Sequence, residues 1–225
     1  GNYAYIADGA SGLAVIDITD LTSPGDPVYM DTTGYANGVT VVGNYAYVAD
    51  LYSGLAIIDI TDPTSPGTPV YMDTSGTTKG VTVVGNYAYI ADAGSGLAII
   101  DITDPTSPGT PVYKNTTGYA EGVTVVGNYA YIADANSGLA VIDITDPTSP
   151  GDPVYMDTTG LSKGVTVVGN YAYVGDYESG LAIIPVVPII TIAAGAITGT
   201  ITFTGIDDSN KEDDETIIIT PSTSP

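Results

Sequence analysis

Residues 38–73 read GVTVVGNYAYVADLYSGLAIIDITDPTSPGTPVYMD, and this stretch decides the fold. It contains four short runs rich in β-branched and aromatic residues, separated by Gly, Asn, Ser, Asp and Pro. Runs of this kind between turn residues are typical of strands, and none shows the 3.6-residue period of a helix. The loop at 62–67 carries two prolines, which fix φ and disfavour a helix. We therefore predict a repeating set of strands, first met at 3–8, 12–18, 27–31 and 38–42.

The same unit recurs along the chain. Copies begin at Gly1, Gly43, Gly85, Gly127 and Gly169, which is a period of 42 residues. A fixed period of about 20–50 residues is the sequence signature of propellers and solenoids, and a four-stranded antiparallel unit of this length fits a propeller blade. We predict an all-β chain. Residues 1–184 are expected to form a five-bladed β-propeller-like repeat domain of four-stranded antiparallel blades, and residues 185–225 a strand-rich acidic tail.

The repeat resembles the LVIVD repeat, a propeller-type repeat of bacterial and archaeal cell-surface proteins. The strand, turn and DPTSP elements of 38–73 occur in the same order, and the resemblance covers roughly residues 1–184. The first copy departs from the pattern with Leu21 in place of the proline. The resemblance implies a propeller fold and an extracellular, cell-surface location, but no particular reaction.

The two ends of the repeat are expected to be incomplete. If GVTVV is the innermost strand and PVYMD the outermost, the first blade lacks its inner strand. The fifth blade then lacks its outer strand, and Pro185 replaces the aspartate that closes the third strand in the other copies. Since unpaired strand edges are normally closed, the apolar runs of the tail at 186–193, 196–205 and 215–220 are candidates to close them.

Two closures are open at this stage. The tail fills the seam of its own ring, giving a closed propeller, or it adds to a neighbouring copy, giving a homopolymer. The residues expected to make the joint are Val186, Val187, Ile189, Ile190, Ile192, Ile201, Phe203, Ile217, Ile218 and Ile219.

The composition excludes several kinds of binding partner and of catalytic or metal site. There are 26 acidic residues against four lysines, and the net charge of −22 disfavours nucleic acid and anionic membranes, because both bind through cations. Cysteine and histidine are absent, which removes disulfides, thiolate zinc sites, cysteine nucleophiles and histidine bases. No apolar run is long enough to span a bilayer. We expect no enzyme, no nucleic-acid partner and no membrane insertion.

The acidic segment IDDSNKEDDETIII (206–219), with GTITFTG (199–205) before it, resembles the end of a Calx-β domain. In that family a matching spacing supplies calcium ligands, which implies Ca²⁺ at Asp207, Asp208, Glu212 and Glu215. Clustered carboxylates are the hard oxygen ligands that Ca²⁺ prefers. The alternative is a charged, solvated hairpin.

Residues that recur in every copy are interpreted first as scaffold. Asp8, Asp50, Asp92, Asp134 and Asp176 precede a Gly-containing turn, where Asp is expected to accept backbone N–H groups in an Asx-type turn rather than to hold a metal or a sugar. Tyrosine pairs from Tyr3/Tyr5 to Tyr171/Tyr173 face one side of a strand and are expected to pack between blades.

Positions that differ between copies are better candidates for partner-specific contacts. They include the residues after each recurring aspartate and the loops ahead of GVTVV at 35–37, 77–79, 119–121 and 161–163. Asn115 begins an Asn-Thr-Thr glycosylation sequon where three other copies carry Asp.

From the sequence we expect an extracellular structural protein that assembles with itself by strand complementation through its tail, forming a filament or surface array. The alternative is a closed propeller that binds a glycan or a protein with its loops.

Overall fold

The computed structural model describes residues 1–186, and these belong to one compact unit. The described residues contain strands and a single-turn 3₁₀ helix, η1 (Tyr177–Ser179). The strands are β1 (Tyr3–Ala7), β2 (Leu13–Asp17), β3 (Val28–Met30), β4 (Gly38–Val42), β5 (Tyr45–Ala49), β6 (Leu55–Asp59), β7 (Val70–Met72), β8 (Gly80–Val84), β9 (Tyr87–Ala91), β10 (Leu97–Asp101), β11 (Val112–Lys114), β12 (Gly122–Val126), β13 (Tyr129–Ala133), β14 (Leu139–Asp143), β15 (Val154–Met156), β16 (Gly164–Val168), β17 (Tyr171–Asp176) and β18 (Gly180–Pro185).

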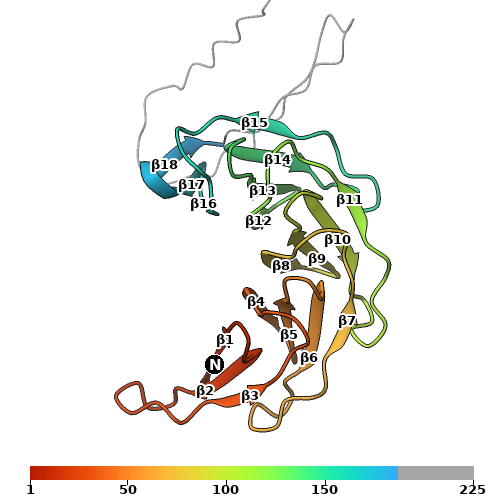
Figure 1. Ribbon diagram of the computed structural model, residues 1–225, viewed down its shortest axis with the longest axis vertical. Coiled ribbons are helices and arrows are strands. Elements are labelled where there is room, and N and C mark those ends of the chain that lie inside the picture. Colours follow the sequence, from red (N-terminus) through yellow and green to blue (C-terminus); the bar gives the residue numbers. More distant parts are fainter. Residues whose placement is uncertain (187–225) are drawn as a thin grey trace, which may run out of the picture. The chain divides into compact units, whose positions relative to one another are not determined.

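The strands form five antiparallel sheets. In chain order these are β1–β3, β4–β7, β8–β11, β12–β15 and β16–β18, which we number sheet 1 to sheet 5. The sheets follow one another along the chain, and the GVTVV strands β4, β8, β12 and β16 lie next to each other along the inner side (Figure 1). The predicted all-β, propeller-like fold is confirmed, as is the order of strands within a blade.

Each sheet is a meander held in register by short turns. In sheet 2, Val42 pairs with Tyr45 across the two-residue turn Gly43-Asn44, and Tyr47 pairs with both Thr40 and Ile57. Gly43 has φ of 58°, a conformation that costs a residue without Cβ little. Turns this short fix the register, so the alternation of side chains sends each residue to a defined face.

The core lies between sheets. We call the sheet side that carries the paired tyrosines face A, and the opposite side face B. Face A of sheet 2, with Tyr47, Leu55 and Ile57, packs on face B of sheet 3, with Ile90 and Ile100. The junctions of sheets 1 with 2 and 3 with 4 repeat the arrangement. The prediction that the tyrosine pairs form a blade-to-blade layer is confirmed for sheets 2 to 4, where Tyr47, Tyr89 and Tyr131 are buried, but not for the fifth pair, because Tyr171 is 48% exposed.

The terminal sheets have three strands each. Sheet 1 lacks a GVTVV strand beside β1, and sheet 5 lacks an outer strand beside β18 within the described residues. This agrees with the strand order expected from the sequence. The fifth copy also extends beyond residue 184: Pro185 pairs with Tyr171, and the N–H of Val186 donates to the carbonyl of Asn170 at 2.7 Å. Val186 thereby takes the position that Ile60 holds in the second copy.

Among the described residues, no helix has the length and apolar character needed to cross a membrane.

Candidate functional site

The recurring aspartates hold consecutive sheets together. Asp92, at the end of β9, accepts hydrogen bonds from Thr74 Oγ1 at 2.7 Å and from the Gly76 N–H at 2.9 Å. Both donors belong to the segment that joins β7 of the preceding sheet to β8, which we call the linker. Asp50, Asp134 and Asp176 make the same two bonds with their own linkers. Each of these carboxylates therefore binds the linker from the preceding sheet to its own sheet.

The structural role predicted for these aspartates is confirmed, but the predicted partners are wrong. An Asx-type turn would place the donors within the next few residues, whereas Gly76 lies 16 residues before Asp92. No local sequence pattern indicates this pairing, because the two residues meet only when the linker runs past the next sheet. Burial raises the pKa of Asp92 and of Asp134, and the hydrogen bonds from the linker oppose that rise.

The Asx-type geometry is found instead in the DPTSP loops. Asp101 Oδ1 accepts the N–H of Thr103 at 2.8 Å, and Asp104 Oδ1 accepts the N–H of Thr106 at 2.9 Å. The side-chain hydrogen bonds from these threonines lower the pKa of both carboxyls. These exposed aspartates shape the loops and do not gather around a common point: within residues 1–186 no group of three or more acidic side chains is placed to hold a metal ion.

The first aspartate of the series is different. Asp8 is exposed, whereas Asp50, Asp92 and Asp134 are fully buried, because no linker among the described residues lies against sheet 1. Its neighbours Ser11 and Tyr29 occupy the places of Ser95 and Tyr113, which contact the linker of sheet 3. Sheet 1 thus carries a linker-binding surface with no linker on it among the described residues.

No described residue covers the outer faces of the terminal sheets either. On face A of sheet 5, Leu181 and Ile183 are 61% and 56% exposed, whereas the equivalent Leu139 and Val141 are 0% and 4% exposed. On face B of sheet 1, Ile6 is 43% exposed, while its counterpart Val48 is 0% exposed. The two uncovered faces are of the same two types, A and B, that pack together at the internal junctions.

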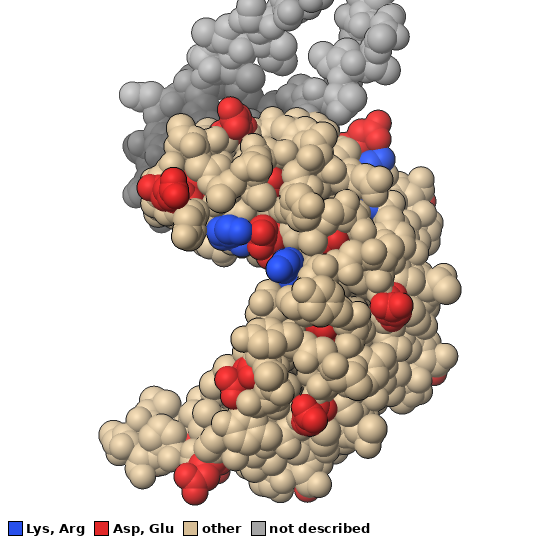
Figure 2. Space-filling view, viewed as in Figure 1, with Lys and Arg blue, Asp and Glu red and all other residues tan. Residues whose placement is uncertain are grey.

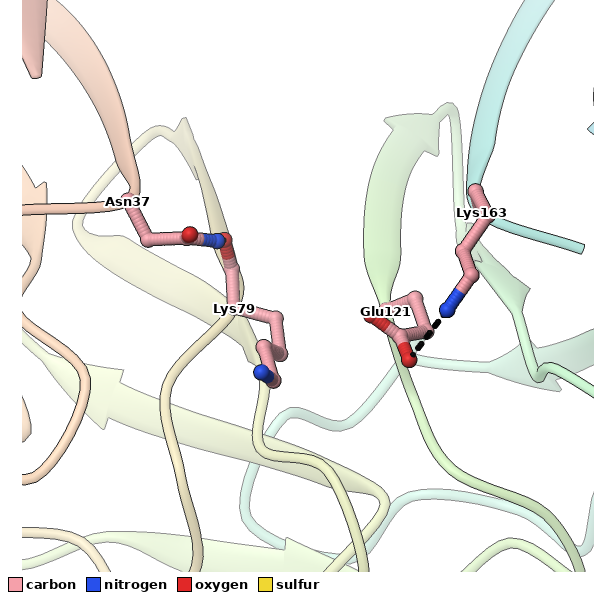
Figure 3. A network of polar contacts seen from close by, with 4 residues as sticks. All are labelled: Asn37, Lys79, Glu121 and Lys163. Carbon is pink, nitrogen blue, oxygen red and sulfur yellow. Dashed lines mark hydrogen bonds and ion pairs between the residues drawn. The ribbon is translucent and has the colours of Figure 1, made fainter.

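A second group of side chains lies where the linkers meet the inner strands (Figure 3). One equivalent position in four copies is occupied by Asn37, Lys79, Glu121 and Lys163. The backbone N–H of each donates at 2.8 Å to a backbone carbonyl at or near the end of the second strand of the same sheet. Lys163 Nζ lies 2.8 Å from Glu121 Oε1, and Asn37 Nδ2 donates to the carbonyl of Lys79. These are the positions that vary between copies, so the repeat keeps its scaffold while it changes the charge at this end.

Charge elsewhere on the repeat unit is dispersed. Figure 2 shows acidic side chains spread singly over one face, most of which is uncharged. Asn115 is exposed directly after β11, and its glycosylation stays a prediction.

Most of the predicted assembly and calcium residues lie outside the described residues. These are Val187, Ile189, Ile190, Ile192, Ile201, Phe203, Ile217, Ile218 and Ile219 for assembly, and Asp207, Asp208, Glu212 and Glu215 for Ca²⁺. Val186 is described and is buried in the repeat unit.

Comparison with known proteins identifies the repeat. The family model described as "LVIVD repeat" matches residues 1–31, 33–74, 75–112, 117–157 and 159–186. No curated protein sequence matches the chain significantly.

Solved structures share the fold at low identity. The β-propeller domain of Cps50 (Swd1) from Myceliophteria thermophila has a TM-score of 0.63 and 10% identity, with 82% of this chain and 62% of that chain covered. The Pan2 WD40 domain of Neurospora crassa has a TM-score of 0.61 and 14% identity, covering 84% and 60%. BamB from Moraxella catarrhalis has a TM-score of 0.57 and 20% identity, covering 81% and 54%. The chain therefore spans little more than half of the length of these structures.

Proposed function

The chain belongs to the LVIVD repeat family, and on that premise we propose that it is an extracellular structural protein of the cell surface whose copies join end to end. The repeat resembles those of cell-surface proteins, and the fastening of one sheet to the next by buried aspartates suits a load-bearing scaffold. Catalysis has no part in this proposal.

One observation carries the proposal: the two terminal sheets expose the faces that the internal junctions bury. Face A of sheet 5 presents Leu181 and Ile183, and face B of sheet 1 presents Ile6. Burial of a Leu or Ile side chain contributes about 1.5–3 kcal/mol, so covering these side chains favours association. Because an A face and a B face are complementary at the internal junctions, a second copy offers sheet 5 a partner of matching shape.

A contact of this type is heterologous: face A of one copy meets face B of the next and leaves a free face at each end. Such contacts generate rings when the rotation closes and filaments when it does not. The tail, expected from the sequence to supply the missing strands, lies beyond the described residues, and its strands are proposed to belong to the same joint.

Calcium is proposed as a stabiliser of that joint. Asp207, Asp208, Glu212 and Glu215 supply carboxylate oxygens of the kind Ca²⁺ prefers, and their repulsion is expected to weaken assembly when the ion is removed. Assemblies prepared in Ca²⁺ should shrink in EDTA and recover on adding Ca²⁺ back. An unchanged size distribution in sedimentation velocity would remove calcium from the proposal while leaving the contact between sheet faces.

The central test places charges on the uncovered face. The double variant Leu181→Glu/Ile183→Glu should sediment as a monomer at concentrations where the unaltered chain forms larger species. Leu21→Glu is the matched control, because Leu21 is 78% exposed in the β2–β3 loop, outside the strands of both terminal sheets. Negative-stain images should show rings or filaments for the unaltered chain and for the control. A strictly monomeric unaltered chain at high concentration, with and without Ca²⁺, contradicts the proposal.

The polar group at the inner strands favours a second candidate, a glycan- or protein-binding propeller. Lys79, Glu121 and Lys163 combine donors and an acceptor on one side of the repeat unit. A Lys79→Ala/Lys163→Ala variant that loses binding on a glycan array, while it assembles normally, would support this function.

A further inference from the structure

The tail repeats the spacing of a linker. In the copies, a proline precedes the outer strand, and the linker glycine follows it seven residues later. Four residues after the linker glycine comes the glycine that begins the inner strand. Pro69, Gly76 and Gly80 are one example. The same spacing occurs at Pro27, Gly34 and Gly38; at Pro111, Gly118 and Gly122; and at Pro153, Gly160 and Gly164. In the tail it occurs once more, at Pro188, Gly195 and Gly199.

The structure shows why the linker needs this glycine. A Cβ on Gly76 would lie 2.2 Å from the carbonyl oxygen of Asp92, and on Gly34 2.2 Å from that of Asp50. The N–H of the same glycine donates to the aspartate carboxylate. In the described linkers, a glycine at this spacing lies against an Asp-x-x-Ser turn of the following sheet, and Gly195 has the same spacing in the sequence.

Four linkers are matched to four aspartates. One aspartate and one segment with the linker spacing are left over. Asp50, Asp92, Asp134 and Asp176 already hold Gly34, Gly76, Gly118 and Gly160. Among the described residues, the aspartate without a linker is Asp8, in sheet 1. In the same part of the chain, sheet 1 has no inner strand and sheet 5 has no outer strand. At the start of β16 a Cβ on Gly164 would meet nothing within 4 Å, whereas on Gly122 it would meet the Gly164 Cα at 3.2 Å.

We propose that residues 188–203 form a fifth outer strand, linker and inner strand, and that this inner strand, Gly199–Phe203, pairs with β1 of a second copy. Residues 189–191 would add to β18 of their own sheet 5. Gly195 would donate to Asp8 of the second copy. The next strand would complete that copy's sheet 1 and lie beside Gly164. This inference rests on the proposed end-to-end assembly and assigns its joint.

The internal sheets give the register. Thr40 pairs with Tyr47 and Val41 with Ala46 in sheet 2. Transferred by the repeat, Ile201 faces Tyr5 and Thr202 faces Ala4. The tail departs from the copies at Ala193, which replaces the linker threonine, so Asp8 would receive the glycine N–H without the hydroxyl. It also departs in the inner strand, where Thr200, Ile201 and Thr202 take the places of Val39, Thr40 and Val41.

A second copy is favoured over the same chain as the partner of β1. The exposed faces of sheets 1 and 5 favour this partner, since a ring closed within one chain would bury them.

Cysteine pairs test the register, because the natural chain contains no cysteine. Two single variants, Ala4→Cys and Thr202→Cys, are mixed and oxidised, so that only a bond between copies joins them covalently. Directly opposed residues meet the distance a disulfide requires, whereas residues two positions apart do not. The mixture should therefore give a heterodimer on non-reducing gels, several-fold more than Ile6→Cys mixed with Thr202→Cys, which is the control. The double variant Ala4→Cys/Thr202→Cys should form ladders.

The outcomes separate this inference from the proposed function. If the matched and control pairs crosslink equally, the register is overturned but end-to-end assembly is not. The same holds if neither pair crosslinks while sedimentation shows that the chain assembles. A double variant that gives only an internally bonded monomer shows closure within one chain and overturns the inference. A chain that never assembles overturns both.

Discussion

At the scale of single residues, two kinds of aspartate work in opposite electrostatic settings. Asp92 is buried between sheets, where removal from water opposes its charge and its pKa is raised despite hydrogen bonds from Thr74 and Gly76. Asp104 is exposed in a DPTSP loop, where hydrogen bonds from Thr106 favour the charged form and lower its pKa. The first kind binds the linker between two sheets, and the second stabilises the conformation of a loop.

Asp92→Asn should destabilise the protein by about 1–3 kcal/mol at pH 7, because the amide NH₂ cannot accept a bond and one buried linker donor loses its partner. The pKa of Asp92 in the folded state lies above its unfolded value, so the folded state holds the proton more tightly. Its titration therefore stabilises the unaltered chain at low pH, and this contribution is lost as pH rises through the folded pKa. The difference in unfolding free energy between the unaltered chain and Asp92→Asn should grow as pH falls from 7 towards 4, measured by urea unfolding.

Asp104→Asn is the control with the opposite sign. The pKa of Asp104 is lowered in the folded state, so its contribution is present above the unfolded pKa and lost as pH falls through the folded one. The stability difference for Asp104→Asn should therefore shrink on acidification. A parallel pH trend in the two variants would contradict the assigned environments.

At the scale of elements, the linker decides how closely one sheet follows another. Its glycine lies against the backbone of the next sheet, and its N–H and the preceding threonine reach the buried aspartate. A tyrosine of the following outer strand completes the contact: Tyr113 Oη accepts the N–H of Ser75 at 2.9 Å. Strands β7 and β11 have three residues each, so these linker contacts supplement short ladders.

Gly76→Ala should lower the unfolding free energy by about 1–3 kcal/mol, since the added methyl group overlaps a backbone oxygen that cannot rotate away. Gly94→Ala is the matched control, because Gly94 is exposed in the β9–β10 turn and a Cβ there would approach only Tyr119, at 3.8 Å. That variant should change stability by no more than about 0.5 kcal/mol. Thermal or urea unfolding of the two variants distinguishes them, and equal effects would mean that the linker yields freely.

At the scale of the whole molecule, the net charge opposes association between copies, whereas the exposed apolar surface favours it. The net charge of −22 makes copies repel, while the faces of sheets 1 and 5 that expose Ile6, Leu181 and Ile183 attract. Screening by salt weakens the first effect and leaves the second almost unchanged.

Assembly should therefore increase with ionic strength. Between about 20 and 300 mM NaCl, where the screening length shortens several-fold, the weight-average mass in light scattering should rise at fixed protein concentration. Leu181→Glu/Ile183→Glu should stay monomeric across the same range. Dissociation of the unaltered chain at high salt would show that ion pairs, and not the apolar faces, hold the copies together.

The sequence by itself determined the repeat, the strands and their order within a sheet. These follow from local physics, because turn residues at fixed spacing set the hairpins and the alternation in YAYVA and LAIID sets the two faces. The same counting predicted the strands that sheets 1 and 5 lack among the described residues, and the strand spacing predicted the packing role of the tyrosines in sheets 2 to 4.

Only the tertiary structure decided what the recurring aspartates do. Asp92 and Gly76 are 16 residues apart and belong to different sheets, so no local pattern pairs them, and the sequence alone favoured a nearby turn. The structure likewise decided that Asp8 is exposed, because burial depends on whether a linker from another sheet lies over the residue. Periodicity predicts which residues share a face, whereas the neighbour that covers the face is settled by how the sheets are stacked.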